Sequence, residues 1–118
     1  MSEYAEQCAL FEWARLQEKI IPELALLNAS ANGCRVSIGS AVKMKCQGLK
    51  KGFPDISLPV ARGEFHGLFI EMKFGKNKQS PEQKEWEAAL TVQGYKYSLA
   101  YSGSSAVQII KDYLNLKN

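Results

Sequence analysis

The fold of this chain is decided by residues 52–73, which read GFPDISLPVARGEFHGLFIEMK. Residues 56–60 alternate apolar and polar side chains, as a half-buried strand does, and residues 68–73 form a second strand-like segment. Residues 61–67 lie between the two segments and contain two glycines, which is typical of a hairpin loop. The stretch therefore predicts a β-hairpin.

Three ionisable side chains lie at the open end of this hairpin. Asp55 precedes the first strand, whereas Glu71 and Lys73 share one face of the second, because strand residues two apart point the same way. If the hairpin is symmetric about Gly63, Asp55 lies opposite Glu71, with Cβ atoms roughly 4.5–5.5 Å apart. Two carboxylates at that distance repel each other unless a cation lies between them.

This combination of side chains is suited to metal-assisted cleavage of a phosphodiester. Carboxylates bind hard divalent cations, and the cation and Lys73 together offset charge on a reacting phosphate. The alternative is a surface hairpin with a lysine–glutamate pair across its strands. The Asp…Glu-x-Lys pattern by itself does not distinguish the two interpretations.

Further motifs flank the hairpin and favour the first interpretation. The chain contains, in order, KGFPD at 51–55, GLFIEMK at 67–73 and SPEQKEW at 80–86. Gly94-Tyr95 and a C-terminal helix ending near Tyr113-Leu114 follow. On these motifs the chain, from about Glu6 to Leu114, resembles the VRR-NUC branch of the PD-(D/E)xK nuclease superfamily.

The resemblance implies both an architecture and an activity. It implies a single nuclease domain over residues 1–118, with a restriction-endonuclease-like α/β/α fold, that cuts DNA using Mg²⁺ or Mn²⁺. Small stand-alone members, mostly from phages and bacteria, are homodimeric enzymes of branched DNA such as four-way (Holliday) junctions. A non-catalytic DNA-binding or assembly module with the same fold is the alternative. The intact set of Asp55, Glu71 and Lys73 argues against it.

Local sequence signals predict the order of elements. Before the hairpin we expect a helix from Ser2 to about Lys19, a strand over 24–29 and a helix over 40–47. After the hairpin we expect a helix from Ser80 to before Gly94 and a strand over 97–101. A last helix, capped by Ser104 or Ser105, ends near Leu116. The pattern predicts an α/β fold with a small mixed sheet covered by helices.

Glu6 is the predicted third acidic ligand. It precedes Leu10 by four residues and Trp13 by seven, so it shares their apolar helix face, where an unpartnered carboxylate is unusual. The resemblance places a glutamate of the first helix at the cation, and Glu6 matches that position best. The alternative is a first-turn acid favoured by the helix dipole. Glu3 could serve either role, and we favour Glu6 as the ligand.

Gln83 has two compatible interpretations. Ser80-x-x-Gln83 is a capping box, in which the glutamine side chain bonds back to the cap residue. The resemblance also places a glutamine near the active site, where it assists Lys73 or a water. We therefore include Gln83 with Asp55, Glu71 and Lys73 as a candidate catalytic residue.

The resulting hypothesis assigns one role to each residue. Asp55, Glu71, the backbone carbonyl of Met72 and Glu6 hold one or two Mg²⁺ or Mn²⁺ ions. Lys73 orients a water or helps to deprotonate it, and offsets charge in the transition state.

Basic residues flank the predicted cation site on both sides. As a set they predict contacts to a DNA backbone, although any one of them could be an ordinary solvated side chain. The set comprises Arg35, Lys43, Lys45, Lys50, Lys51, Lys76 and Lys78. Because nothing resembles a base-reading helix, selectivity for DNA structure is expected rather than for sequence.

Composition excludes several other classes of protein. The net charge of +3 is only mildly basic, and one domain is expected for 118 residues. Three scattered cysteines predict free thiols rather than disulfides or structural zinc. A single histidine and no phosphate-binding glycine loop argue against Ser–His–Asp chemistry and a nucleotide cofactor.

With no signal peptide and no apolar run of about 20 residues, we expect a cytoplasmic protein, in a bacterial or phage-infected cell.

Overall fold

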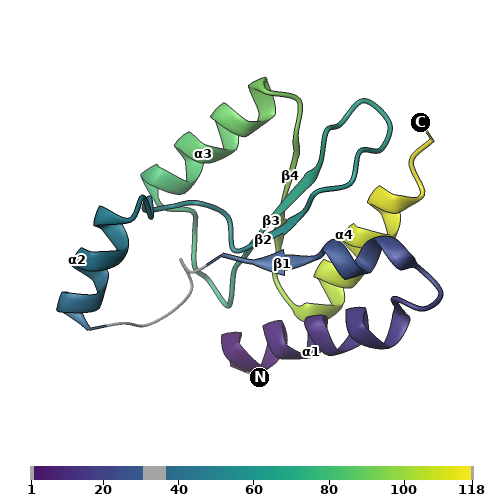
Figure 1. The fold of residues 1–118 in the computed structure, drawn as a ribbon, viewed down its shortest axis with the longest axis horizontal. Coiled ribbons are helices and arrows are strands. Elements are labelled where there is room, and N and C mark those ends of the chain that lie inside the picture. The colour runs from purple at the N-terminus through teal and green to yellow at the C-terminus, as the bar shows by residue number, and fades with distance from the viewer. Residues whose placement is uncertain (1, 31–36, 118) are drawn as a thin grey trace.

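In the computed structural model, which describes residues 2–30 and 37–117, helices surround a mixed sheet (Figure 1). The elements of these residues are α1 (Glu3–Gln17), the 3₁₀ helix η1 (Pro22–Leu26), β1 (Asn28–Ala29), α2 (Ile38–Cys46), β2 (Ile56–Leu58), β3 (Leu68–Met72), α3 (Pro81–Val92), β4 (Lys96–Ala100) and α4 (Gly103–Leu114). The predicted α/β fold class is confirmed.

The hairpin forms the centre of the sheet. The strand order is β1-β2-β3-β4, with antiparallel pairing of β1 to β2 and of β2 to β3, and parallel pairing of β3 to β4. Ile56 pairs with Ile70 and Leu58 with Leu68, so the register is symmetric about residue 63, as predicted. One step further along this register, Asp55 lies opposite Glu71.

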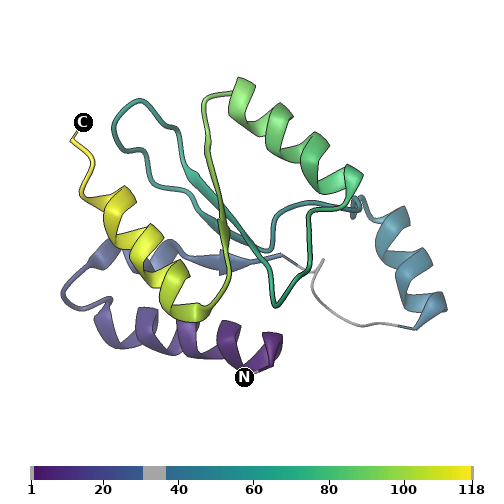
Figure 2. The ribbon, with the colours of Figure 1, turned by 180° about the vertical axis from the view of Figure 1, so that it is seen from behind.

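The register divides the side chains of the sheet between two faces. One face is apolar and packs against α1 and α4, which lie together on one side of the sheet (Figures 1 and 2). Its side chains, each at most 3% exposed, are Ile56, Leu58, Leu68, Ile70, Met72 and Ala100. These side chains form the core together with buried residues of α1 and α4, among them Leu10 and Ile110.

Helix α3 covers the opposite face of the sheet (Figure 2). Phe69 of β3 meets the ring of Phe53 edge-on at 5.6 Å, and Phe53 meets Trp86 of α3 at 4.9 Å. Because strand residues alternate in direction, Glu71 and Lys73 lie on the same face as Phe69. The candidate site is therefore on the α3 side of the sheet, at the end of β3.

The prediction of a strand over residues 24–29 is wrong for most of that stretch. Pro22 begins η1 instead, and the Leu27 N–H donates to the carbonyl of Leu24, so only Asn28–Ala29 remains as a strand. Proline is favoured in the first turn of a helix, and here this local preference outweighs the short apolar run.

Two helices also begin earlier than predicted. Ser37 caps α2, which was predicted over 40–47, and Ser102 caps α4 in place of Ser104 or Ser105. In each case the earlier serine accepts a hydrogen bond from the backbone N–H three residues later, that of Ser40 or Ser105. By contrast, the predicted caps of α1 (Ser2) and α3 (Ser80) are confirmed.

Two other sequence-based expectations concern cysteines and membranes. Cys8 and Cys46 are free, as predicted, while Cys34 lies outside the described residues. Within residues 2–30 and 37–117, the helices are too short or too polar to cross a bilayer.

A glycine brings the segment before Asp55 against α3. Gly52 has a φ of +88°, and a Cβ atom on it would lie 2.7 Å from both the backbone carbon and the Cβ of Glu82. Only glycine accommodates both the left-handed backbone and this close approach. The KGFPD motif therefore has a structural requirement separate from its carboxylate.

We predict that Gly52→Ala destabilises the protein more than Gly48→Ala. Gly48 also has a positive φ, of +103°, but has open space around it, so alanine there costs only the left-handed conformation, about 1–2 kcal/mol. At Gly52 the clash with α3 should add roughly 1–3 kcal/mol. Urea unfolding of the two variants measures the difference, and equal losses would show that the close approach carries no cost.

Candidate active site

Asp55 and Glu71 form a buried pair of carboxylates where β2 and β3 end. Asp55 is 8% exposed and Glu71 is 2% exposed. The Oδ2 atom of Asp55 accepts a hydrogen bond from the backbone N–H of Met72 at 2.8 Å. The backbone carbonyl of Asp55 also accepts from the N–H of Ser30, at 2.7 Å. These two bonds hold Asp55 at the end of the hairpin.

Glu71 carries the strongest electrostatic perturbation of the site. Burial, followed by the neighbouring Asp55 carboxylate, raises the pKa of Glu71 from 4.5 to about 9, although the Lys73 ammonium acts in the opposite direction. Within the described residues, the buried Oε1 atom of Glu71 has no hydrogen-bond partner. A buried polar atom of this kind is costly, so the site as it stands is poised to take up a proton or a cation.

Lys73 reaches from the sheet to α3. Its backbone N–H donates to the carbonyl of Ala100 in β4 at 2.8 Å, and its ammonium donates to Oε1 of Gln83 at 2.6 Å. The same Oε1 atom accepts from the backbone N–H of Ser80 at 2.9 Å, which completes the capping box of α3. One glutamine oxygen therefore both caps the helix and holds the lysine.

The two candidate glutamates of α1 have different surroundings. The Oε2 atom of Glu6 accepts a hydrogen bond from the backbone N–H of Gly103, at the start of α4. The charge of Glu3, in contrast, contributes to the raised pKa of Glu71. The N-terminus of α1 thus lies near the site, but a role for Glu6 as a metal ligand remains a prediction.

The structure brings some of the predicted site residues together, but not all of them. Among residues 2–30 and 37–117, no three acidic, histidine or cysteine side chains are grouped closely enough to hold a metal ion by themselves. The structure brings together Asp55, Glu71, Lys73 and Gln83, with the backbone of Met72 alongside. Any further ligand must come from a rearranged side chain, water or substrate.

The lysines predicted to contact DNA are on the surface. Lys43 and Lys45 are exposed on α2, which projects beside the start of α3 (Figure 1). Lys50, Lys76 and Lys78 are also exposed, and Arg35 lies outside the described residues.

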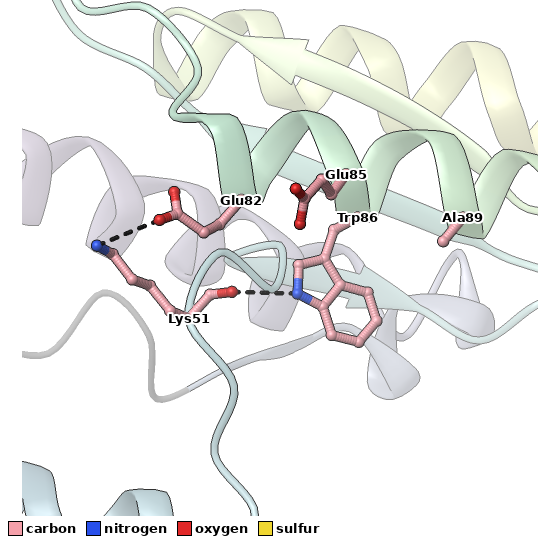
Figure 3. A pocket seen from close by; sticks show the side chains of 5 residues that line it. All are labelled: Lys51, Glu82, Glu85, Trp86 and Ala89. Atoms are coloured by element: carbon pink, nitrogen blue, oxygen red, sulfur yellow. Dashed lines mark hydrogen bonds and ion pairs between the residues drawn. The ribbon is translucent and has the colours of Figure 1, made fainter.

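Lys51 is also exposed, and it contacts α3 through an ion pair and a hydrogen bond. Its ammonium lies 3.5 Å from Oε1 of Glu82, and its backbone carbonyl accepts from Nε1 of Trp86 at 3.1 Å (Figure 3). With Glu85 and Ala89 these residues line an open groove of about 300 Å³. Because two glutamates line it, this groove is poorly suited to phosphate, and its contacts serve to attach the KGFPD segment to α3.

Sequence reasoning missed two polar residues on the site face. Tyr97 of β4 pairs with Phe69 of β3, two residues before the position that pairs with Glu71. Nε2 of Gln79 donates to the hydroxyl of Tyr97 at 3.3 Å. The alternation of β4 could have placed Tyr97 on one face, but only the pairing of β4 with β3 identifies that face.

Comparison with known proteins identifies related chains. The sequence pattern of the VRR-NUC domain family matches residues 2–104. A solved structure described as a VRR_NUC domain protein is 30% identical, with a TM-score of 0.84, covering 100% of this chain and 92% of that chain. A comparison with curated proteins found no match. The matched residues include every acidic and basic residue predicted for the site.

We predict that, without divalent metal, the free energy of unfolding falls as pH rises from about 4.5 to about 9. Over this window the folded protein keeps a proton on Glu71 that the unfolded chain releases, so stability declines by up to about 1.4 kcal/mol per pH unit. Glu71→Gln cannot ionise, so its advantage over wild type should grow with pH. Urea unfolding in a chelating buffer measures both proteins.

The matched control for this experiment is Glu85→Gln, which neutralises an exposed glutamate of α3. Its stability should follow wild type at every pH. Parallel curves for Glu71→Gln and wild type would mean that Glu71 is ionised in the folded protein.

Proposed function

This chain belongs to the VRR-NUC family, whose domain is a nuclease domain, and we propose that it is a metal-dependent deoxyribonuclease that hydrolyses phosphodiester bonds. We further propose that residues 1–118 act as one such domain. The observation that carries this proposal is the buried carboxylate pair of Asp55 and Glu71 beside the Lys73 ammonium.

The chemistry of this pair fits a hard divalent cation. Carboxylate and carbonyl oxygens are the ligands that Mg²⁺ and Mn²⁺ prefer. The buried Oε1 atom of Glu71 lacks a partner within the described residues, and burial, a side-chain interaction with Asp55 and repulsion by that carboxylate raise the pKa of Glu71. A cation between the two groups removes both penalties, because it supplies the missing partner and lets Glu71 ionise.

Asp55 and Glu71, with the backbone carbonyl of Met72, would hold the ion. The N–H of Met72 points to Asp55, and in a strand the N–H and carbonyl of one residue point to the same side. Glu6 is the further candidate ligand, provided that its carboxylate leaves the N–H of Gly103. A bound ion supplies positive charge that stabilises the reacting phosphate and lowers the pKa of a water.

Lys73 supplies the second positive charge. Its ammonium has three hydrogens, and the one directed to Gln83 leaves others for the phosphate or for the attacking water. Because Gln83 is held by the capping box, the ammonium is oriented before substrate arrives. Pre-oriented charge of this kind lowers the barrier to reaction without a cost of reorganisation at the moment of cleavage.

The proposed substrate is branched DNA, such as a Holliday junction, cut by a homodimer. Both features come from the family resemblance, since two sites on a dimer can reach two strands. The exposure of the lysines on α2 and on the turn after β3, which precede and follow the carboxylates in the sequence, supports contacts to phosphates.

We predict that Asp55→Ala and Lys73→Ala each lower the cleavage rate by at least about 10²-fold, because each removes a charge from the reacting phosphate's surroundings. The measurement is cleavage of single-stranded, duplex, flap and four-way junction DNA, with Mg²⁺ and with a chelator. Wild type should cut fastest on the four-way junction and only with metal.

The matched control is Lys96→Ala, which removes an exposed lysine at the opposite end of β4 and should leave the rate unchanged. Calorimetry with Mn²⁺ should show binding to wild type that is lost in Glu71→Ala. Full cleavage by folded Lys73→Ala would contradict the catalytic role proposed for Lys73. Metal binding without cleavage of any substrate would favour the non-catalytic alternative.

We predict that replacing Lys43 and Lys45 with alanine weakens DNA binding and reduces its dependence on salt. Each lost phosphate contact lowers the slope of log K against log salt by roughly one. Fluorescence anisotropy over a salt series, in a chelator to prevent cleavage, measures the slope. Lys96→Ala again serves as the control, and an unchanged slope in the double variant would exclude α2 from the DNA interface.

A further inference from the structure

Gln79 links three elements next to the proposed active site. Its Nε2 atom donates to Oε1 of Glu87 in α3 at 3.0 Å and to the hydroxyl of Tyr97 in β4 at 3.3 Å. Gln79 itself lies immediately before Ser80, the cap residue of α3. A single side-chain amide thus joins the segment before α3 to both the helix and the sheet.

The turn between β3 and α3 is attached to β4 at both ends. At its start, the backbone N–H of Lys73 donates to the carbonyl of Ala100 at 2.8 Å. At its end, Gln79 bonds to Tyr97 of the same strand. Between these anchors the Asn77 N–H donates to the carbonyl of Phe74 at 3.1 Å, which closes the turn.

The end of this turn determines where the Lys73 ammonium lies. Oε1 of Gln83 accepts from both the Ser80 backbone N–H and the Lys73 ammonium. A displacement of Ser80 therefore moves Gln83, and with it the partner of the lysine. Since Gln79 is the neighbour of Ser80 in the chain, its side-chain bonds control this displacement.

Resting on the proposed nuclease function, we propose that Gln79, held by Tyr97 and Glu87, is a positioning residue that fixes the 74–80 turn and thereby the ammonium of Lys73. Gln79 does not touch the reacting atoms in this scheme. It acts through the Ser80–Gln83 capping box, and it also sets the position of Lys76 and Lys78 on the turn.

The surroundings of Tyr97 support this assignment. The ring is half-buried, and burial raises the pKa of Tyr97 to about 12, so the phenol stays neutral near Glu71 and Glu87. A neutral hydroxyl can accept the amide hydrogen of Gln79 and retains its own hydrogen for donation. A partly buried hydrogen bond of this kind restrains the segment that it anchors.

The test compares Gln79→Ala and Tyr97→Phe with wild type in two measurements. Hydrogen exchange followed by mass spectrometry should show faster exchange of the peptide spanning residues 73–83 in both variants. The single-turnover cleavage rate at saturating four-way junction DNA, with Mg²⁺, should fall on the order of ten-fold in Gln79→Ala, because the side-chain bonds to Glu87 and Tyr97 are both lost. Calorimetric Mn²⁺ affinity should stay at the wild-type value.

The control variant is Gln108→Ala. It removes an amide that donates a hydrogen bond to the Asp112 carboxylate on the exposed side of α4. It should change neither the exchange of residues 73–83 nor the rate. The double variant of Gln79→Ala with Tyr97→Phe should be no slower than Gln79→Ala alone, since both changes remove the same bond.

The outcomes separate this proposal from the proposed function. Unchanged exchange of residues 73–83 in Gln79→Ala, or faster exchange with an unchanged cleavage rate, overturns the positioning role. If Gln79→Ala unfolds, Tyr97→Phe decides by the same two criteria, because it removes only one hydroxyl. If wild type cuts none of the DNA substrates, the proposed function fails, while exchange still decides whether Gln79 anchors the turn.

Discussion

The hydrogen bond from the Met72 backbone N–H to Oδ2 of Asp55 connects the fold to the candidate site. At the end of the hairpin ladder, a side-chain carboxylate takes the position of a backbone acceptor, so the sheet itself orients the acid. This arrangement requires the register that pairs Ile56 with Ile70. A slip of one residue would turn Asp55 and Glu71 to opposite faces, because side-chain direction alternates along a strand.

The same geometry makes the site costly to fold. A buried carboxylate is disfavoured unless it is paired or protonated, and Glu71 is 2% exposed beside a second acid. The Lys73 ammonium offsets only part of this cost, as the raised pKa of Glu71 shows. The buried Glu71 carboxylate thus lowers the stability of the fold at the place where a bound cation would remove the cost. Functional sites often lower the stability of a protein in this way.

The start of helix α3 has a structural role and a proposed functional role that use the same atoms. Oε1 of Gln83 satisfies a free N–H at the helix start and also accepts from Lys73. Gly52 lets the segment before Asp55 approach the same helix end. The capping box of Gln83 is therefore confirmed, and its bond to Lys73 is compatible with the predicted role near the active site. The capping box, which is a local motif, thus also positions the ammonium of Lys73.

The short-range patterns of the chain were enough to predict the hairpin, its symmetry about residue 63, and the caps at Ser2 and Ser80. Alternation and capping depend on residues within a few positions of one another, so they are readable without knowledge of the fold. The contact of Glu6 with Gly103 and the link from Gln79 to Tyr97 were not readable. These contacts depend on how helices and strands distant in sequence pack together, and that packing exists only once the whole chain has folded.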